Sequence, residues 1–251
     1  MTDRPAPGTL IRRHSLATRL WHWVNALALL ILIGSGLGIS NAHPRLYWGV
    51  YGANYDYSWF QPPRFPSWLT IPGQYNLALS RRWHLFFALV LAFGLLAFMI
   101  ASLVNRHFQR DLRVTARDLT PATLRHDIRE HLAFRFHDPD HPGAYNVLQK
   151  LAYVAVIFLL LPLVILTGLA LSPGMDAAWP WLLQLFGGRQ SARSIHFLCM
   201  SGLSLFILVH LALVILAGVG NELRSMITGR WRVPAAPPVP ARPVATEEPA
   251  A

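Results

Sequence analysis

Apolar side chains along this chain gather into four long runs, which polar segments separate. The runs cover about residues 17–39, 83–104, 151–171 and 195–219. Roughly 20 apolar residues in a helix are needed to cross the hydrocarbon core of a bilayer, and each run is about that long. Lipid offers no hydrogen-bond partners to the backbone, so a segment that crosses it must be helical. The pattern therefore predicts an all-α protein, a four-helix transmembrane bundle.

The connection between the first two runs, residues 40–82, is dense in aromatic residues and proline and has no regular period. This pattern predicts an aromatic-rich, ordered and mostly non-helical loop at one membrane surface. Trp48, Trp59 and Trp68 suit interfacial anchoring, because tryptophan is enriched where a bilayer meets water. They equally suit a docking surface for a partner protein. The two interpretations are compatible, and the sequence leaves both open.

The connection between the second and third runs is polar and basic. Thr120 followed by Pro121 is typical of a helix start, with an N-cap residue and then proline in the first turn. A short amphipathic helix is expected there, with an apolar stripe of Leu124, Ile128 and Leu132. Arginines at three- or four-residue spacing predict a basic face toward anionic lipid headgroups: Arg106, Arg110, Arg113 and Arg117. One short stretch has residue types that could bind a metal ion: His137, Asp138, Asp140 and His141. Prolines within this stretch predict a turn, which favours a polar loop over a metal site.

Composition excludes an ordinary soluble domain, since 53% of the residues are hydrophobic and only 14% are charged. No basic run or nucleic-acid motif accompanies the net charge of +10, so we expect membrane lipid and no nucleic acid as a partner. Of the Lys and Arg residues, 16 lie in the two terminal segments and the middle connection, against 6 in the other two connections. The positive-inside rule then places both termini in the cytoplasm.

Three parts are expected along the chain. Residues 1–16 form an N-terminal cytoplasmic tail, 17–221 the four-helix domain, and 222–251 a Pro/Ala-rich cytoplasmic tail. Within the spans, Pro162 predicts a kink in the third helix, and the single cysteine, Cys199, is expected to be a small core residue. Glycines four residues apart in the first helix, Gly34 and Gly38, predict close helix packing.

Four histidines lie within the predicted spans: His22, His84, His196 and His210. An ionisable side chain inside a membrane is costly, and such a residue is a functional candidate by default. His196 and His210 share the fourth helix and are fourteen residues apart, so they lie within about 40° of each other on one face and about 21 Å apart along the axis. By depth, His22 pairs with His210 near the cytoplasmic side, and His84 pairs with His196 near the outer side.

Two histidines at matched depth on facing helices suit a b-type haem, whose iron takes one imidazole on each face of the porphyrin. Each depth offers two clear ligands with no carboxylate or thiol beside them, so zinc fits less well. Covalent c-type attachment is excluded, because the chain has no C-x-x-C-H sequence. The sequence therefore predicts two haem b groups.

Several stretches resemble the di-haem cytochrome b subunits of the Ni/Fe-hydrogenase b-type cytochrome and formate dehydrogenase gamma subunit family, which is cytochrome b561-like. The chain is most similar to the thiosulfate reductase cytochrome b branch. The matching stretches run from Ile11 to Gly229: RLWHWVNAL, NAHPRLYWGVYG, RRWHLFFA, YNVLQKLAY, PLVILTGLALSP, GGRQSARSIHF and GNELRSMITG. The resemblance implies the same two histidine pairs, an inner haem held by His22 and His210 and an outer haem held by His84 and His196.

The resemblance further implies a multi-pass protein of the bacterial inner (plasma) membrane that passes electrons between the quinone pool and a separate redox subunit. That partner is expected on the outer face as a molybdoenzyme or iron–sulfur protein, because this chain has neither domain. No substrate-converting site is expected in the chain itself. Polar groups near the inner haem are the candidates for a quinone site: Arg19, Asn25 and Asn221. Two other functions are considered, a histidine proton relay or transporter and a haem-free membrane anchor for a redox complex.

Overall fold

The structure is a computed structural model, and it describes residues 6–53, 55–106, 108–109, 112–133 and 146–233. Four helical segments are long and apolar enough to cross a membrane: Leu16–Ala42, Leu77–Val104, Val147–Leu171 and Arg189–Leu216. The predicted set of four spans is thereby confirmed. The expected polar loop with His137, Asp138, Asp140 and His141 lies outside the described residues, as does Arg110.

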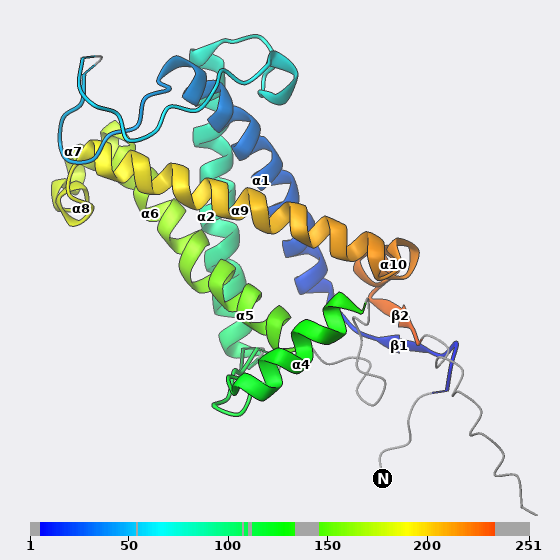
Figure 1. Ribbon diagram of the computed structural model, residues 1–251. Coiled ribbons are helices and arrows are strands. Elements are labelled where there is room, and N and C mark those ends of the chain that lie inside the picture. Colours follow the sequence, from blue (N-terminus) through cyan, green and yellow to red (C-terminus); the bar gives the residue numbers. More distant parts are fainter. Residues whose placement is uncertain (1–5, 54, 107, 110–111, 134–145, 234–251) are drawn as a thin grey trace, which may run out of the picture.

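The four spans form two packed pairs. Helices α1 (Leu16–Ala42) and α2 (Leu77–Val104) contact each other along much of their length, and α6 (Leu161–Leu171) packs against α9 (Arg189–Leu216). Contacts between the pairs are fewer, chiefly α2 with α6. Figure 1 shows α9 crossing the bundle obliquely, from the end where α7 and α8 lie to the end where α10, β1 and β2 lie. We call these the loop end and the terminal end.

The four spans begin earlier than the hydropathy pattern predicts, and a side-chain cap marks the start of the first three. Ser15 accepts a hydrogen bond from the backbone N–H of Thr18 at the start of α1, and Asn76 accepts one from that of Leu79 at the start of α2. Helix α9 starts at Arg189, six residues before the expected 195. Hydropathy marks the depth of the bilayer, whereas the hydrogen-bonded helix continues through polar residues at the membrane surface.

The third span changes geometry in its middle. Helix α5 (Val147–Ala155) leads into a π-helical turn, η2 (Val156–Leu160), and α6 follows with Pro162 in its first turn. Proline has no N–H to donate and its ring crowds the carbonyl four residues earlier, so the preceding turn must widen. The irregularity expected at Pro162 therefore takes the form of a π turn.

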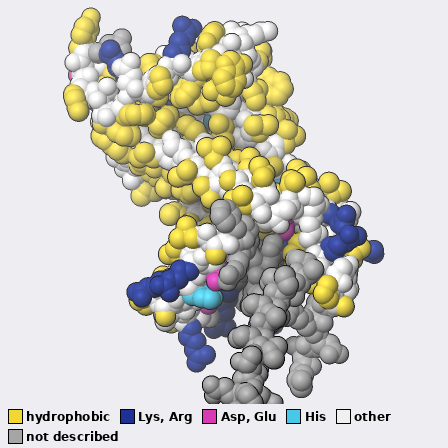
Figure 2. Space-filling model, turned by 45° about the vertical axis from the view of Figure 1, so that its right-hand side comes forward, with side chains coloured by type: hydrophobic (Ala, Val, Ile, Leu, Met, Phe, Trp, Pro, Cys, Tyr) yellow, Lys and Arg dark blue, Asp and Glu magenta, His cyan; other side chains and the backbone are white. Residues whose placement is uncertain are grey.

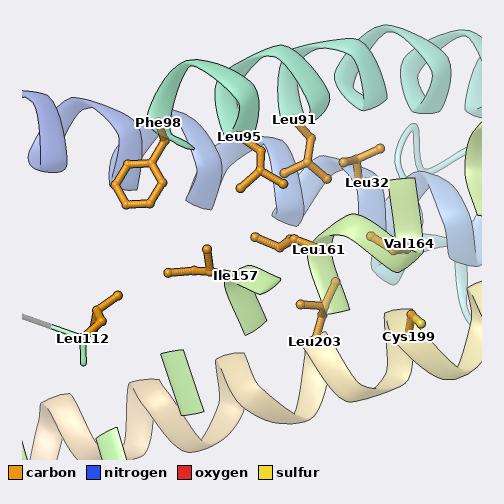
Figure 3. Packing of buried hydrophobic residues seen from close by; sticks show 10 residues of the cluster. All are labelled: Leu32, Leu91, Leu95, Phe98, Leu112, Ile157, Leu161, Val164, Cys199 and Leu203. Carbon is orange, nitrogen blue, oxygen red and sulfur yellow. The ribbon is translucent and has the colours of Figure 1, made fainter. Parts of the chain in front are cut away.

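All four spans contribute to one apolar core. Leu32 of α1, Leu91 and Leu95 of α2, Leu161 of α6 and Leu203 of α9 are buried together, as Figure 3 shows. Cys199 is buried in the same cluster, which confirms it as a small core residue. Many other leucines are exposed, and Figure 2 shows apolar side chains over the middle of the molecule with Lys and Arg gathered toward its two ends. This distribution fits a bilayer around the middle.

At the loop end, the aromatic loop predicted for residues 40–82 is shorter, because α1 ends at Ala42 and α2 begins at Leu77. Its described residues include a short 3₁₀ turn, η1 (Ser67–Leu69), and an isolated β-bridge between Leu46 and Phe60. The loop is bonded to the start of α9. The Trp59 ring N–H donates to Ser194 Oγ at 2.9 Å, and that hydroxyl donates to the Tyr47 carbonyl at 2.6 Å. Two short helices, α7 (Pro173–Ala178) and α8 (Pro180–Leu185), complete this end. The polar first turns of α9 are therefore occupied by contacts with the loop.

At the terminal end, the structure differs from the expected tails. Strand β1 (Leu10–Arg12) pairs antiparallel with β2 (Arg230–Arg232), and helix α10 (Val219–Thr228) lies between α9 and β2. The all-α prediction is thus correct for the bundle but omits this small sheet. Trp231 is completely buried there, and its ring N–H donates to Glu222 at 3.0 Å. Arg13 contacts the same carboxylate at 3.3 Å. Residues from both expected tails thus form one clasp.

The short helix expected after Thr120 is α4 (Pro121–Leu132), and Thr120 caps it as predicted. The Asp127 carboxylate accepts from the backbone N–H of Val147 at 2.8 Å, which ties α4 to the start of α5. The expected helical basic face does not form in the described residues, since Arg113 lies in irregular chain and Arg117 in a turn. The spacing is helical, but the backbone at Arg113 and Arg117 is not.

Candidate functional site

At the loop end, α2 and α9 bring two histidines together. His84 and His196 each lie seven residues after the first residue of their helix. Their ring centroids are 6.1 Å apart, and the ring planes are inclined by 60°. Both side chains are partly buried. The structure therefore places these two residues beside each other, as their depths predicted.

At the terminal end, α1 and α9 bring the histidines His22 and His210 together. The ring centroids of His22 and His210 are 6.3 Å apart, with an interplanar angle of 57°. Phe206, one turn earlier on α9, stacks on His210 with centroids 5.9 Å apart. The Nδ1 atom of His22 is buried and has no hydrogen-bond partner among the described residues. An unpartnered polar atom in a membrane span is costly, which makes this pair a functional candidate.

The ring separations distinguish two kinds of contact between imidazoles. A direct hydrogen bond of about 2.9 Å, with about 1.1 Å from each ring nitrogen to its ring centre, would place the centroids about 5 Å apart. A metal ion between them, at about 2 Å from each nitrogen, would place them about 6.2 Å apart. The observed 6.1 Å and 6.3 Å are longer than the first value and compatible with the second. Rotation of either ring about the metal–nitrogen axis leaves this separation unchanged, so the tilted planes are compatible with it.

A hydroxyl group contacts each histidine of the loop-end pair. Ser35 Oγ lies 3.0 Å from Nδ1 of His84, and Thr167 Oγ1 lies 3.0 Å from Nδ1 of His196. Both hydroxyl-bearing residues are completely buried. Each hydroxyl also lies 2.7 Å from the carbonyl oxygen of the residue four positions earlier in its own helix. A carbonyl can only accept, so the hydroxyl proton belongs to that bond.

The hydroxyl oxygens are then left to accept from the imidazoles. The proton of each ring lies on Nδ1, and the lone pair on Nε2 is free to bind a metal ion. Metal-binding histidines in proteins almost always donate their other ring N–H in this way. The hydrogen bonds therefore hold His84 and His196 in the tautomer that a metal ligand needs.

A glycine lies beside each of these two imidazole rings, where a larger side chain would not fit without a shift. A Cβ atom added at Gly36 would lie 3.4 Å from Cε1 of His84, and one added at Gly168 would lie 3.3 Å from Cε1 of His196. Carbon atoms pack best at about 3.5–4.0 Å, so a larger residue at either position would press on the ring. Gly38 packs closely instead against Ser80 of α2, which agrees with the helix packing predicted for it, whereas Gly34 faces Ile71 of the aromatic loop.

The residues proposed for a quinone site differ in their surroundings. Arg19 donates from Nη1 to the Ile227 carbonyl, and Asn221 forms two hydrogen bonds to the Arg232 backbone at 2.8 Å and 2.9 Å. Both therefore hold the terminal clasp together. Asn25 is buried, with 9% of its surface exposed, and follows His22 by one helical turn. It is the buried member of the set, and it lies in the same span as His22.

Four residues that contact the loop-end histidines were not predicted from the sequence: Ser35, Gly36, Thr167 and Gly168. A signal was present, because Ser35-Gly36-Leu37 in the first span recurs as Thr167-Gly168-Leu169 in the third. Small and hydroxyl-bearing residues are common where membrane helices pack. In the sequence, the repeat therefore indicates helix packing, and only the structure shows that each copy lies beside a histidine.

Comparisons with known proteins identify a family for this chain. The model of the family described as prokaryotic cytochrome b561 matches residues 13–229. The chain is 31% identical over 216 residues to "Putative protein-methionine-sulfoxide reductase subunit YedZ1" of Azospira oryzae, covering 84% of this chain and 93% of the relative. It is 26% identical over 240 residues to "Probable Ni/Fe-hydrogenase B-type cytochrome subunit" of Azotobacter vinelandii, covering 90% of this chain and 89% of the relative. No solved structure matches the chain.

The family match covers more than half of the chain, including all four spans and all four histidines. The expected relationship to hydrogenase b-type cytochromes is confirmed, while the narrower likeness to thiosulfate reductase subunits stays a prediction. Such proteins bind b-type haem and transfer electrons as membrane subunits of oxidoreductases. The chain belongs to the prokaryotic cytochrome b561 family and is an integral, multi-pass bacterial membrane protein.

Proposed function

We propose that the chain is a di-haem cytochrome b that carries electrons between the quinone pool and a partner oxidoreductase subunit. The observation that carries the proposal is the pair of imidazole couples with ring centroids 6.1 Å and 6.3 Å apart, each sharing α9. His84 with His196 would hold one haem iron, and His22 with His210 the other. Two imidazoles at each end suit the two axial positions that a porphyrin leaves open.

When bound, the haem groups supply reversible one-electron exchange at iron. The residues of the chain hold and separate them. His196 and His210 are fourteen residues apart on α9, which is about 21 Å at 1.5 Å per residue. That distance spans much of a hydrocarbon core of about 30 Å. The core of α1, α2, α6 and α9 excludes water between the two sites. The arrangement suits electron transfer across the bilayer.

The partner is proposed to dock at the loop end. With both termini in the cytoplasm, as the distribution of Lys and Arg favours, this end faces outward. Trp48, Tyr51, Tyr57 and Trp68 are exposed there, and exposed aromatic groups are enriched in protein interfaces. The names of the relatives, a methionine-sulfoxide reductase subunit and a hydrogenase cytochrome subunit, fit a separate catalytic partner. A molybdoenzyme or an iron–sulfur protein is our candidate for that partner.

The quinone is proposed to bind at the terminal end, beside His22 and His210. Asn25 offers a buried amide one helical turn from His22, and an amide can donate to or accept from a quinone oxygen. Arg19 has a buried Nε atom without a hydrogen-bond partner among the described residues. Both residues lie on α1 within one helical turn of His22. Asn221 is a weaker candidate, because its amide is bonded to the β2 backbone.

The decisive measurement is the haem content of the purified chain. A pyridine haemochrome assay should give two haem b per chain, and the reduced protein should show the α band of low-spin, bis-histidine haem. A ratio of one would reject the two-site proposal. A chain without haem would instead favour a proton relay or a haem-free anchor.

Single-ligand variants then test the pairing. His84→Ala and His196→Ala should each remove one and the same haem, and His22→Ala and His210→Ala should each remove the other. In a redox titration, the two alanine variants of one histidine pair should both lack the same haem component. Loss of different components by His84→Ala and His196→Ala would contradict the proposed pairs.

A further inference from the structure

The loop-end histidines are supported by two matching pieces of the fold. In one, α1 presents Ser35 and Gly36 to His84 of α2. In the other, α6 presents Thr167 and Gly168 to His196. Both pieces consist of a packed pair of antiparallel helices, and both hydroxyl-to-ring distances are 3.0 Å. The loop-end site is thus built twice over from the same arrangement of hydroxyl, glycine and histidine.

The terminal pair has no such support among the described residues. The Nδ1 atom of His22 is buried without a hydrogen-bond partner, and His210 is contacted by the Phe206 ring, which stacks on it. An aromatic ring can orient an imidazole but does not select its tautomer. The histidine pairs at the two ends of the bundle therefore differ in the contacts that hold their rings.

The difference has a defined chemical consequence. An imidazole that donates Nδ1–H to an acceptor becomes a stronger electron donor through Nε2 and keeps a fixed ring orientation. The acceptor here is a hydroxyl that itself donates to a helix carbonyl, and hydrogen bonds in such a chain polarise one another. Stronger donation stabilises the oxidised iron, which lowers the reduction potential of a haem bound there relative to the same site without the hydroxyls.

We propose that Ser35 and Thr167 are positioning residues for the loop-end site, and that they fix the tautomer and orientation of His84 and His196 before any cofactor binds. This inference rests on the proposed function, since it assigns roles beside the proposed haem ligands. It makes the loop-end site preorganised. At the terminal site, Nδ1 of His22 has no such hydroxyl partner among the described residues.

The test uses the full chain with Ser35→Ala and Thr167→Ala. Each should weaken retention of the loop-end haem by about 10–100-fold, the usual effect of removing a group bonded to a metal ligand. In a redox titration, the component abolished by His84→Ala should move to higher potential, while the component abolished by His22→Ala should stay in place. Ser35→Thr and Thr167→Ser retain a hydroxyl and should restore the original values.

Two hydroxyls on α9 provide matched controls. Ser201 and Ser204 each donate to the carbonyl four residues earlier at 2.9 Å, as Ser35 and Thr167 do, but neither is bonded to a histidine. Ser201→Ala and Ser204→Ala should therefore leave both components unchanged. Equal shifts of both components in Ser35→Ala, or no shift in either alanine variant, would overturn the proposal.

A second measurement needs no haem. Nitrogen NMR of the haem-free, ¹⁵N-histidine-labelled chain should show His84 and His196 protonated on Nδ1, and a mixture of tautomers at His84 in Ser35→Ala. A mixture already present in the unaltered chain would overturn the proposed role of the hydroxyls. If the chain bound no haem yet kept these tautomers, the proposed function would fail while the positioning by Ser35 and Thr167 would stand.

Discussion

Replacing Gly168 by alanine would add one methyl group beside the ring of His196. The new Cβ atom would lie 3.3 Å from Cε1 of that ring. Ordinary carbon contacts are about 3.5–4.0 Å, so the ring must retreat by about 0.2–0.7 Å. Functional side chains need to be held within about 0.5 Å of their working geometry. We therefore expect Gly168→Ala to weaken retention of the loop-end haem by about tenfold.

The same substitution acts in the opposite direction on the helix. Alanine in a helix interior is more stable than glycine by roughly 0.5–1 kcal/mol, because it loses less backbone freedom on folding. The thermal unfolding temperature should therefore stay level or rise while haem is lost. This combination separates a local effect on His196 from general destabilisation.

The measurement is the ratio of haem to protein after dialysis, with a redox titration to identify the remaining component. Gly36→Ala, with its Cβ at 3.4 Å from His84, should give a smaller loss, and Gly94→Ala, with no atom within 4 Å, should give none. Equal loss from both haem sites in Gly168→Ala would refute the reasoning. So would full retention in Gly168→Ala alongside loss in Gly94→Ala.

Two further predictions concern the ends of the bundle. Trp231→Ala should destabilise the terminal clasp by about 3–5 kcal/mol, the usual cost of removing a buried tryptophan side chain. Trp181 is exposed, so Trp181→Ala should have no such effect. Thermal unfolding in detergent measures the stability of both variants. Ser194→Ala removes a hydroxyl bonded to Trp59 and to the Tyr47 carbonyl, and should cost about 1–3 kcal/mol. Limited proteolysis should then cut the aromatic loop faster, and an unchanged rate would show that the loop is held by other contacts.

The sequence predicted the spans and the depth of the histidines well, because both depend on local composition. A run of about 20 apolar residues has few alternatives to a membrane helix. Within such a run, residue number converts directly to depth. His22 therefore lies beside His210, and His84 beside His196, as the sequence analysis expected. That these rings bind haem iron stays a prediction.

The parts that were missed depend on contacts between distant residues. Strand β1 exists because Leu10–Arg12 meets Arg230–Arg232, and neither three-residue segment predicts a strand alone. The polar start of α9 is stable because the aromatic loop bonds to Ser191 and Ser194. Ser35 and Thr167 became site candidates only when the packing of α1 with α2 and of α6 with α9 placed them beside the histidines.

The position of α9 in the chain has a consequence for biosynthesis. It is the last of the four spans to leave the ribosome, yet it carries one histidine of each pair. A nascent chain that ends before Arg189 has His22 and His84 inserted in the membrane without either partner ring. The clasp between β1 and β2 closes later still. Neither histidine pair can therefore form during early membrane insertion, and the proposed haem groups could bind between the paired rings only after synthesis of nearly the whole chain.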